Sequence, residues 1–177
     1  DEHEPDYTTR LYAAYISARL IAANGDVYEG VRRLDELSFS GVGPLEARAL
    51  YDMYRLQLDA DLITRPEAIE HLENLRYRWR GDTIELDTVR TLGELYVEDG
   101  AFAQGLETMF TAQSRFPDTE AGRRIGEEMV NIFRQLFLEG GADRMDPIEA
   151  VALYYQYKDL APIGTDGDRM LRRLADR

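Results

Sequence analysis

The sequence predicts an all-α protein built from helical hairpins. Apolar residues recur three and four positions apart through most of the chain, and this spacing places them on one face of a helix. Glycine, asparagine and proline interrupt the spacing at short intervals, as expected for helices joined by tight turns. No run of alternating β-branched residues predicts a strand.

Four helices are expected in the first half of the chain. The first runs from Tyr7 to Asn24-Gly25, since both of these residues readily take the left-handed conformation at a helix end. The second continues to Leu37. Pro44 opens the third, in a first turn where its missing N–H costs little. Thr64-Arg65-Pro66-Glu67 opens the fourth, with Thr as the N-cap and Glu at the third helical position.

Five more helices are expected in the second half. The turns that separate them from the fourth helix and from one another are Gly81-Asp82, Asp99-Gly100, Phe116-Pro117, Gly140-Gly141 and the stretch around Pro162. The loop from Gly140-Gly141 to Asp146-Pro147 is wider than its counterparts. The eighth helix starts at Asp146-Pro147 and ends before Pro162, and a ninth starts near Asp166.

Composition limits the classes of partner. The 177 residues include 34 acidic and 21 basic side chains, which gives a formal net charge of −13. This charge opposes binding to nucleic acids and anionic membranes, and favours a basic or neutral partner. At 44% hydrophobic residues, the chain is predicted to fold. It lacks cysteine, which suits the cytoplasm and the bacterial periplasm alike.

Membrane and export signals are also missing from the sequence. No run approaches the roughly 18 apolar residues of a membrane span, and no signal peptide is visible. The sequence starts at Asp1 and not at Met, so we expect it to be a piece of a longer protein.

No pattern in the sequence argues for catalysis, a cofactor or a metal. Glu67 and His71 are four residues apart on one helix face, but the only other histidine is His3, so a solvated helix surface is the better interpretation. Gly41-Val42-Gly43 lacks the third glycine and nearby lysine of a phosphate-binding turn. No serine has a nucleophile-elbow context. We therefore predict a non-catalytic protein.

The segment Leu86 to Thr119 carries a recognisable pattern. It has Leu92-Gly93-x-x-Tyr96 on its first helix, and the matching residues on and after its second helix are Gly105, Met109, Ala112 and Pro117. The segment therefore resembles the tetratricopeptide repeat (TPR), a helical hairpin of about 34 residues. Val89 stands at the usual Trp position. Small residues at Gly93 and Gly105 would let the two helices approach closely.

Weaker copies of the second helix give a repeat structure for the chain. Gly30, Ala68, Gly105 and Ala150 align as small anchors, at intervals of 38, 37 and 45 residues. The resemblance implies a right-handed α-α superhelix, a TPR-like solenoid of about four hairpins plus a terminal helix. We expect a single domain, 1–177, with units at about 7–39, 44–81, 85–118 and 119–162 and a terminal helix at 166–177. An ordinary helical bundle is the alternative.

The resemblance also implies a function. In TPR-like proteins the first helix of each hairpin lines a concave groove that holds a peptide, so we expect a protein–protein interaction scaffold that binds a protein or peptide there. By alignment, the charged residues on this concave face are Arg19, Arg48, Arg55, Asp87, Arg90, Glu94 and Arg123. They form either an anion track or a row of solvated ion pairs such as Arg90 with Glu94.

A second function from a different class remains open. The chain can be a structural spacer, one segment of a longer helical array with no ligand of its own. The sequence names no partner and leaves the oligomeric state undetermined.

Overall fold

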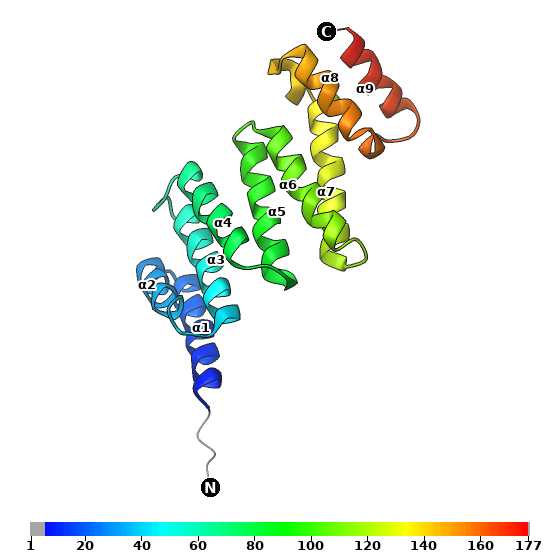
Figure 1. Ribbon diagram of the computed structural model, residues 1–177. Coiled ribbons are helices and arrows are strands. Elements are labelled where there is room, and N and C mark those ends of the chain that lie inside the picture. Colours follow the sequence, from blue (N-terminus) through cyan, green and yellow to red (C-terminus); the bar gives the residue numbers. More distant parts are fainter. Residues whose placement is uncertain (1–5, 177) are drawn as a thin grey trace. The chain divides into compact units, whose positions relative to one another are not determined.

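The computed structural model describes residues 6–176, and every regular element in that range is helical (Figure 1). The elements, in chain order, are α1 (Tyr7–Ala23), α2 (Val27–Leu37), α3 (Gly43–Asp59), α4 (Arg65–Arg78), α5 (Asp82–Glu98), α6 (Phe102–Arg115), α7 (Glu120–Phe137), η1 (Gly141–Arg144), α8 (Pro147–Gln156), η2 (Lys158–Leu160) and α9 (Thr165–Ala175). The predicted all-α class is confirmed. The chain forms two compact units, Asp1–Leu92 and Gly93–Arg177.

Helix starts follow the local signals in the sequence. At α4 the hydroxyl of Thr64 accepts a hydrogen bond from the Glu67 N–H, and the Glu67 carboxylate accepts one from the Thr64 N–H at 2.7 Å. This reciprocal pair satisfies two of the N–H groups that a helix start leaves without partners. The carboxylate of Asp146 caps α8 by accepting from the Ile148 and Glu149 N–H groups. The predicted cap at Thr64 and the predicted helix start at Asp146-Pro147 are therefore confirmed.

The eighth helix ends before Pro162, as expected. α8 stops at Gln156, and the chain then tightens into the short 3₁₀ helix η2 before Pro162. A residue that precedes proline is disfavoured in the α conformation, and Ala161 is indeed extended. The wide loop before α8 contains a second 3₁₀ turn, η1.

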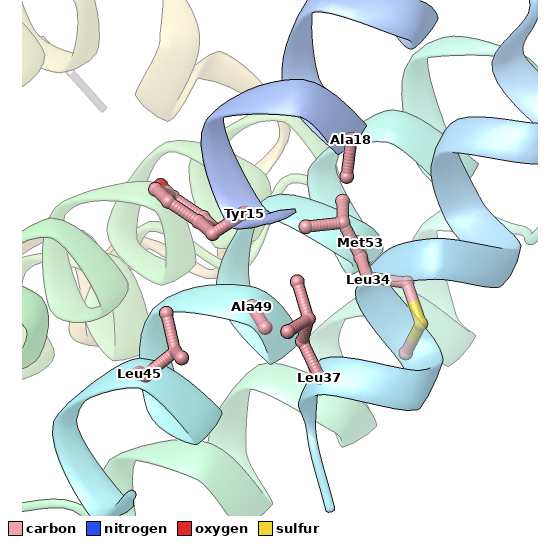
Figure 2. Close-up of a cluster of buried hydrophobic side chains, with 7 residues drawn as sticks. All are labelled: Tyr15, Ala18, Leu34, Leu37, Leu45, Ala49 and Met53. Atoms are coloured by element: carbon pink, nitrogen blue, oxygen red, sulfur yellow. The ribbon is translucent and has the colours of Figure 1, made fainter. Parts of the chain in front are cut away.

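The core of the first unit lies where α1, α2 and α3 meet (Figure 2). Its buried side chains are Tyr15, Ala18, Leu34, Leu37, Leu45, Ala49 and Met53. Gly30 of α2 lies against α1, where an added Cβ would come within 2.6 Å of the Ala22 Cβ. Small residues at this contact allow the two helices of the first hairpin to approach closely.

The core of the second unit is built around α7. The apolar residues of α7 that periodicity assigned to one face are all buried: Ile125, Met129, Ile132, Phe133, Leu136 and Phe137. Phe133 lies against Phe137 and against Tyr154 of α8, with ring centroids 4.7 and 5.4 Å apart. An added Cβ at Gly105 would come within 3.0 Å of the Gly93 carbonyl oxygen. The close approach predicted at these two glycines is therefore present.

Candidate partner-binding face

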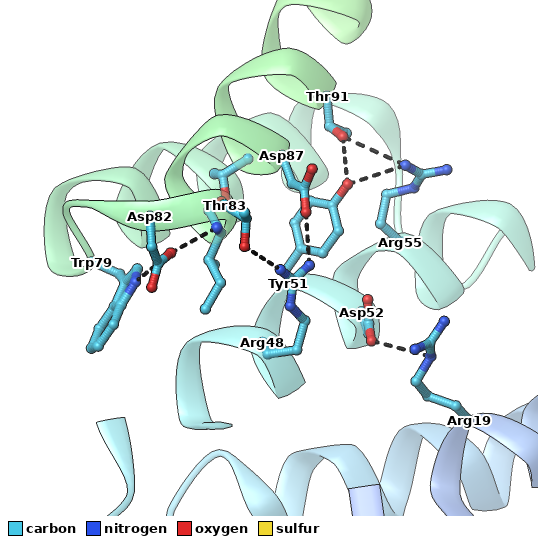
Figure 3. A network of polar contacts seen from close by, with 12 residues as sticks. Arg19, Arg48, Tyr51, Asp52, Arg55, Trp79, Asp82, Thr83, Asp87 and Thr91 are labelled. Atoms are coloured by element: carbon cyan, nitrogen blue, oxygen red, sulfur yellow. Dashed lines mark hydrogen bonds and ion pairs between the residues drawn. The ribbon is translucent and has the colours of Figure 1, made fainter. Parts of the chain in front are cut away.

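In the sequence analysis, three helices of the first unit are each the first helix of a predicted hairpin. They are α1, α3 and α5, of which only the start belongs to this unit. Side chains of α3 form hydrogen bonds with side chains of α5 (Figure 3). The start of α5 is fixed locally, since the Asp82 carboxylate accepts hydrogen bonds from the Ile84 N–H at 2.8 Å and from the Trp79 indole at 3.4 Å. We call the polar side of these three helices the inner-helix face.

Arg48 joins α3 to α5. Its guanidinium donates to the Asp87 carboxylate at 2.9 Å and to the Thr83 hydroxyl at 3.4 Å. Burial disfavours the charged guanidinium, but the hydrogen bond to Asp87 and the negative charges of Asp87 and Asp52 outweigh it and raise the pKa of Arg48. The charge of Arg48 is therefore matched by a carboxylate of the same unit.

Asp52 connects α3 to α1. Its carboxylate accepts a short hydrogen bond from the Tyr15 hydroxyl and lies 3.5 Å from the Arg19 Nε. The guanidinium of Arg19 also lies over the Tyr15 ring, 5.6 Å from its centroid. The Asp52 side chain is 18% exposed, whereas that of Arg19 is 60% exposed. Arg19 therefore keeps most of its surface available despite the ion pair.

The pKa of Tyr15 is raised to about 12. Burial is the largest cause, and the hydrogen bond to Asp52 and the negative charge of Asp52 add to it. The folded state thus favours the neutral phenol. The neutral phenol of Tyr15 contributes fully to the stability of the fold below about pH 10, the ordinary pKa of tyrosine. This contribution is lost as the pH rises toward the folded-state pKa of about 12.

Replacing Tyr15 with phenylalanine tests this linkage. We expect the free energy of unfolding to fall by about 1 kcal/mol near neutral pH, because the hydrogen bond to Asp52 is lost. The difference between the two proteins should shrink from about pH 10 upward, since only the wild type has a phenol at this position to ionise. Denaturant unfolding measured across this pH range checks both points. A difference independent of pH would contradict the assignment.

A second polar cluster stabilises the contact between α3 and α5. The hydroxyls of Tyr51 and Thr91 are 2.9 Å apart in a buried hydrogen bond, and Arg55 donates to the Tyr51 hydroxyl at 3.3 Å. Sequence reasoning missed Tyr51 and Thr91. The signal that could have found them is helical spacing, because Tyr51 lies three residues after Arg48, and Thr91 four residues after Asp87.

A groove of about 330 Å³ opens between α1 and α3 on this face. Its lining residues are Arg19, Ala22, Ala23, Tyr51, Asp52, Arg55, Leu56 and Asp59. The two alanines and Leu56 supply apolar surface, while two arginines and two aspartates supply charges of both signs. The groove therefore offers apolar surface, hydrogen-bond donors from the arginines and hydrogen-bond acceptors from the aspartates.

The predicted site residues are only partly brought together. Arg19, Arg48, Arg55 and Asp87 share the inner-helix face of the first unit. Arg90 is exposed on α5 in the same unit, and both Arg90 and Glu94 interact with other residues of the chain. Glu94 and the exposed Arg123 of α7 belong to the second unit.

The Glu67 and His71 side chains have structural partners. Glu67 completes the cap of α4, and the His71 ring stacks on Tyr54 with centroids 4.7 Å apart. Within residues 6–176, no cluster of three or more His, Cys, Asp or Glu side chains could hold a metal ion. His3 lies outside the described residues. None of the described helices is both long and apolar enough to cross a membrane.

Two solved structures match this arrangement of helices over nearly its whole length. Both are crystal structures of a candidate kinesin light chain of Podosopora anserina with nearly identical TPR-like repeats, and one of them is of a single-substitution variant. Each gives a TM-score of 0.50 at 15% identity, and the two matches cover 98% and 97% of this chain and 96% of the other. The chain has a TPR-like helical repeat fold.

The similarity of the TPR-like fold is structural, not one of sequence. Neither a family profile nor a curated protein matches the sequence. At 15% identity the two crystal structures establish the fold.

Proposed function

We propose that the chain is a non-catalytic scaffold that binds a partner protein or peptide on its inner-helix face. The observation that carries this proposal is the groove between α1 and α3, which is lined by both apolar and charged side chains. Arg19, Arg48, Arg55 and Asp87 are the binding residues of the first unit, together with Arg90. Glu94 and Arg123 are the candidates in the second unit. The division into four hairpins and a terminal helix is part of the same proposal.

The size of the groove favours a peptide side chain as its occupant. About 330 Å³ is at the lower end of the volumes that hold a small molecule, and fits one or two amino-acid side chains. The two arginines and two aspartates at its edge balance in charge. Because the whole chain carries a net charge of −13, a polyanion is repelled, and a neutral or basic segment with an apolar anchor fits best.

A tryptophan at position 23 tests the groove. Ala23 is the exposed last residue of α1 and lines the groove, so Ala23→Trp should fill it without disturbing the core. We expect at least about a tenfold loss in the affinity of a bound partner, or about 1.4 kcal/mol. Partners are captured from extracts of the source cells and quantified by mass spectrometry, and their affinity is then measured with purified proteins.

The matched control is Ala175→Trp, since Ala175 is the exposed last residue of α9 and lies far from the groove in sequence. Partners that the wild type and this control retain equally, but that Ala23→Trp loses, support the proposal. Equal retention by all three proteins would rule out the groove as the binding site.

A structural spacer is the second candidate function, and a specific observation favours it. The ion pairs of Arg48 with Asp87 and of Arg19 with Asp52 join neighbouring helices, so part of the predicted anion track is neutralised within the protein. A spacer should retain no specific partner, whereas the proposed scaffold should retain the same proteins reproducibly.

A further inference from the structure

Two helix C-termini form one end of the groove between α1 and α3. Ala22 and Ala23 are the last two residues of α1, Leu56 and Asp59 belong to the last turn of α3, and all four line the groove. The C-terminus of a helix carries a partial negative charge, which favours cations nearby. Neither helix has a basic residue in its last turn to balance this charge. This end of the groove therefore favours a cation supplied by a ligand.

Asp59 adds a full negative charge at the same end. Its side chain is exposed, and within residues 6–176 it forms neither a hydrogen bond nor an ion pair. A carboxylate in the last turn of a helix lies beside the partial negative charge of that helix, so its position lowers the stability of the helix. The stability of α3 therefore does not account for an aspartate here, whereas binding of a cation does.

The other charged side chains of the groove have partners within the protein. Arg19 and Asp52 pair with each other at 3.5 Å. Arg55 donates to the hydroxyl of Thr91 on α5 at 3.5 Å, so its guanidinium extends toward α5 (Figure 3). Arg55 precedes Asp59 by one helical turn, but the two described side chains do not form an ion pair. Asp59 is therefore the carboxylate of the groove that a ligand can pair with.

The apolar surface beside Asp59 suits the stem of a long basic side chain. Ala22, Ala23 and Leu56 supply this surface, in a groove of about 330 Å³. Lysine and arginine lay their methylene groups along apolar surface while the charged end stays with polar groups. The net charge of −13 also attracts a basic segment from a distance.

We propose that the groove binds a lysine or arginine side chain of the partner. The stem of this side chain lies on Ala22, Ala23 and Leu56, and its cationic group pairs with Asp59. The inference rests on the proposed function, and it adds Asp59 to the binding residues. Because Asp59 is exposed, the ion pair contributes only a small part of the affinity, about three- to fivefold.

Peptides selected from a library test this inference. A random peptide library displayed on phage is panned against the whole wild-type chain and against Ala23→Trp, and peptides that only the wild type retains are groove ligands. We expect these ligands to share a lysine or arginine. Replacing that residue with norleucine keeps an unbranched apolar stem and removes the charge, so fluorescence anisotropy should show binding about three- to fivefold weaker.

Asp59→Asn makes the matching change in the protein. It should weaken the binding of the basic peptides by the same factor, and the norleucine peptides should then bind this variant no more weakly, since both changes remove one ion pair. Asp35→Asn is the matched control, because Asp35 is also an exposed aspartate in the last turn of a helix, α2, and does not line the groove. It should bind the peptides as the wild type does.

The results that would overturn this inference differ from those that would overturn the scaffold. Groove ligands that share no basic residue, or that Asp59→Asn binds as tightly as the wild type, would refute the cationic anchor and leave the scaffold proposal standing. If panning yields no peptide that Ala23→Trp loses, both proposals fail. Circular dichroism melts of the three variants confirm that a loss of binding is not a loss of folding.

Discussion

Replacing Phe133 with alanine is expected to lower the free energy of unfolding of the second unit by about 3–5 kcal/mol. Phe133 is completely buried on α7, and its ring contacts Phe137 and the α8 residue Tyr154. Removing the ring loses its transfer free energy, its aromatic contacts and the packing of the atoms around the cavity that remains. This loss is a large share of the roughly 5–15 kcal/mol that stabilises a typical domain.

Phe110 offers a matched control for this substitution. It lies on α6, is 50% exposed, and meets Tyr157 edge-on with ring centroids 5.8 Å apart. Because half of its surface is already in water, Phe110→Ala should cost only about 1 kcal/mol. Urea unfolding monitored by circular dichroism gives both values. Equal losses for the two substitutions would show that the α7–α8 contact does not organise the second unit.

Features encoded by neighbouring residues could be predicted from the sequence. The cap at Thr64 and the turn at Asn24-Gly25 depend on groups within a few residues of each other, and Gly25 does adopt a positive φ of 105°. The small residue at Gly105 could also be interpreted, because the TPR pattern specifies where two helices approach closely. These signals determine where helices begin, end and cross.

Contacts between distant helices could not be predicted in the same way. One of the two expected arrangements was a row of ion pairs between neighbours on one helix, such as Arg90 with Glu94, but Arg48 pairs with Asp87, 39 residues away on α5. Tyr51 and Thr91 are 40 residues apart. Helical periodicity reveals which residues share a face, but it does not specify which residue of the next helix lies opposite. The register between helices depends on packing.

The two faces of α1 illustrate a related limit. Ile16 and Leu20 have the same four-residue spacing as Ala18 and Ala22, so this spacing alone does not say why the alanines, and not the larger side chains, face α2. The deciding factor is side-chain volume at the contact with α2. Alanines at 18 and 22 leave room for the close approach of Gly30, whereas isoleucine and leucine would hold the helices apart. The larger side chains therefore face outward.

Adding one methyl group at Gly30 tests this packing argument. The Cβ of Gly30→Ala would come within 2.6 Å of the Ala22 Cβ and 3.2 Å of the Ala18 carbonyl oxygen, and the backbone of α1 can relieve this contact only by moving. We expect a net loss of about 1–2 kcal/mol, since overpacking of about 1–3 kcal/mol exceeds the gain of about 1 kcal/mol in helix propensity. Chemical denaturation of the purified variant measures the loss.

Gly126→Ala is the matched control, because Gly126 is also inside a helix but faces the end of a flexible side chain. A Cβ there would meet the terminal amide of Gln113, which is half-buried and can rotate away. This substitution should therefore be neutral or stabilise the chain by up to about 1 kcal/mol. A stabilised Gly30→Ala variant would show that α1 and α2 have room to separate, and that the small residues of the repeat do not set the distance between its helices.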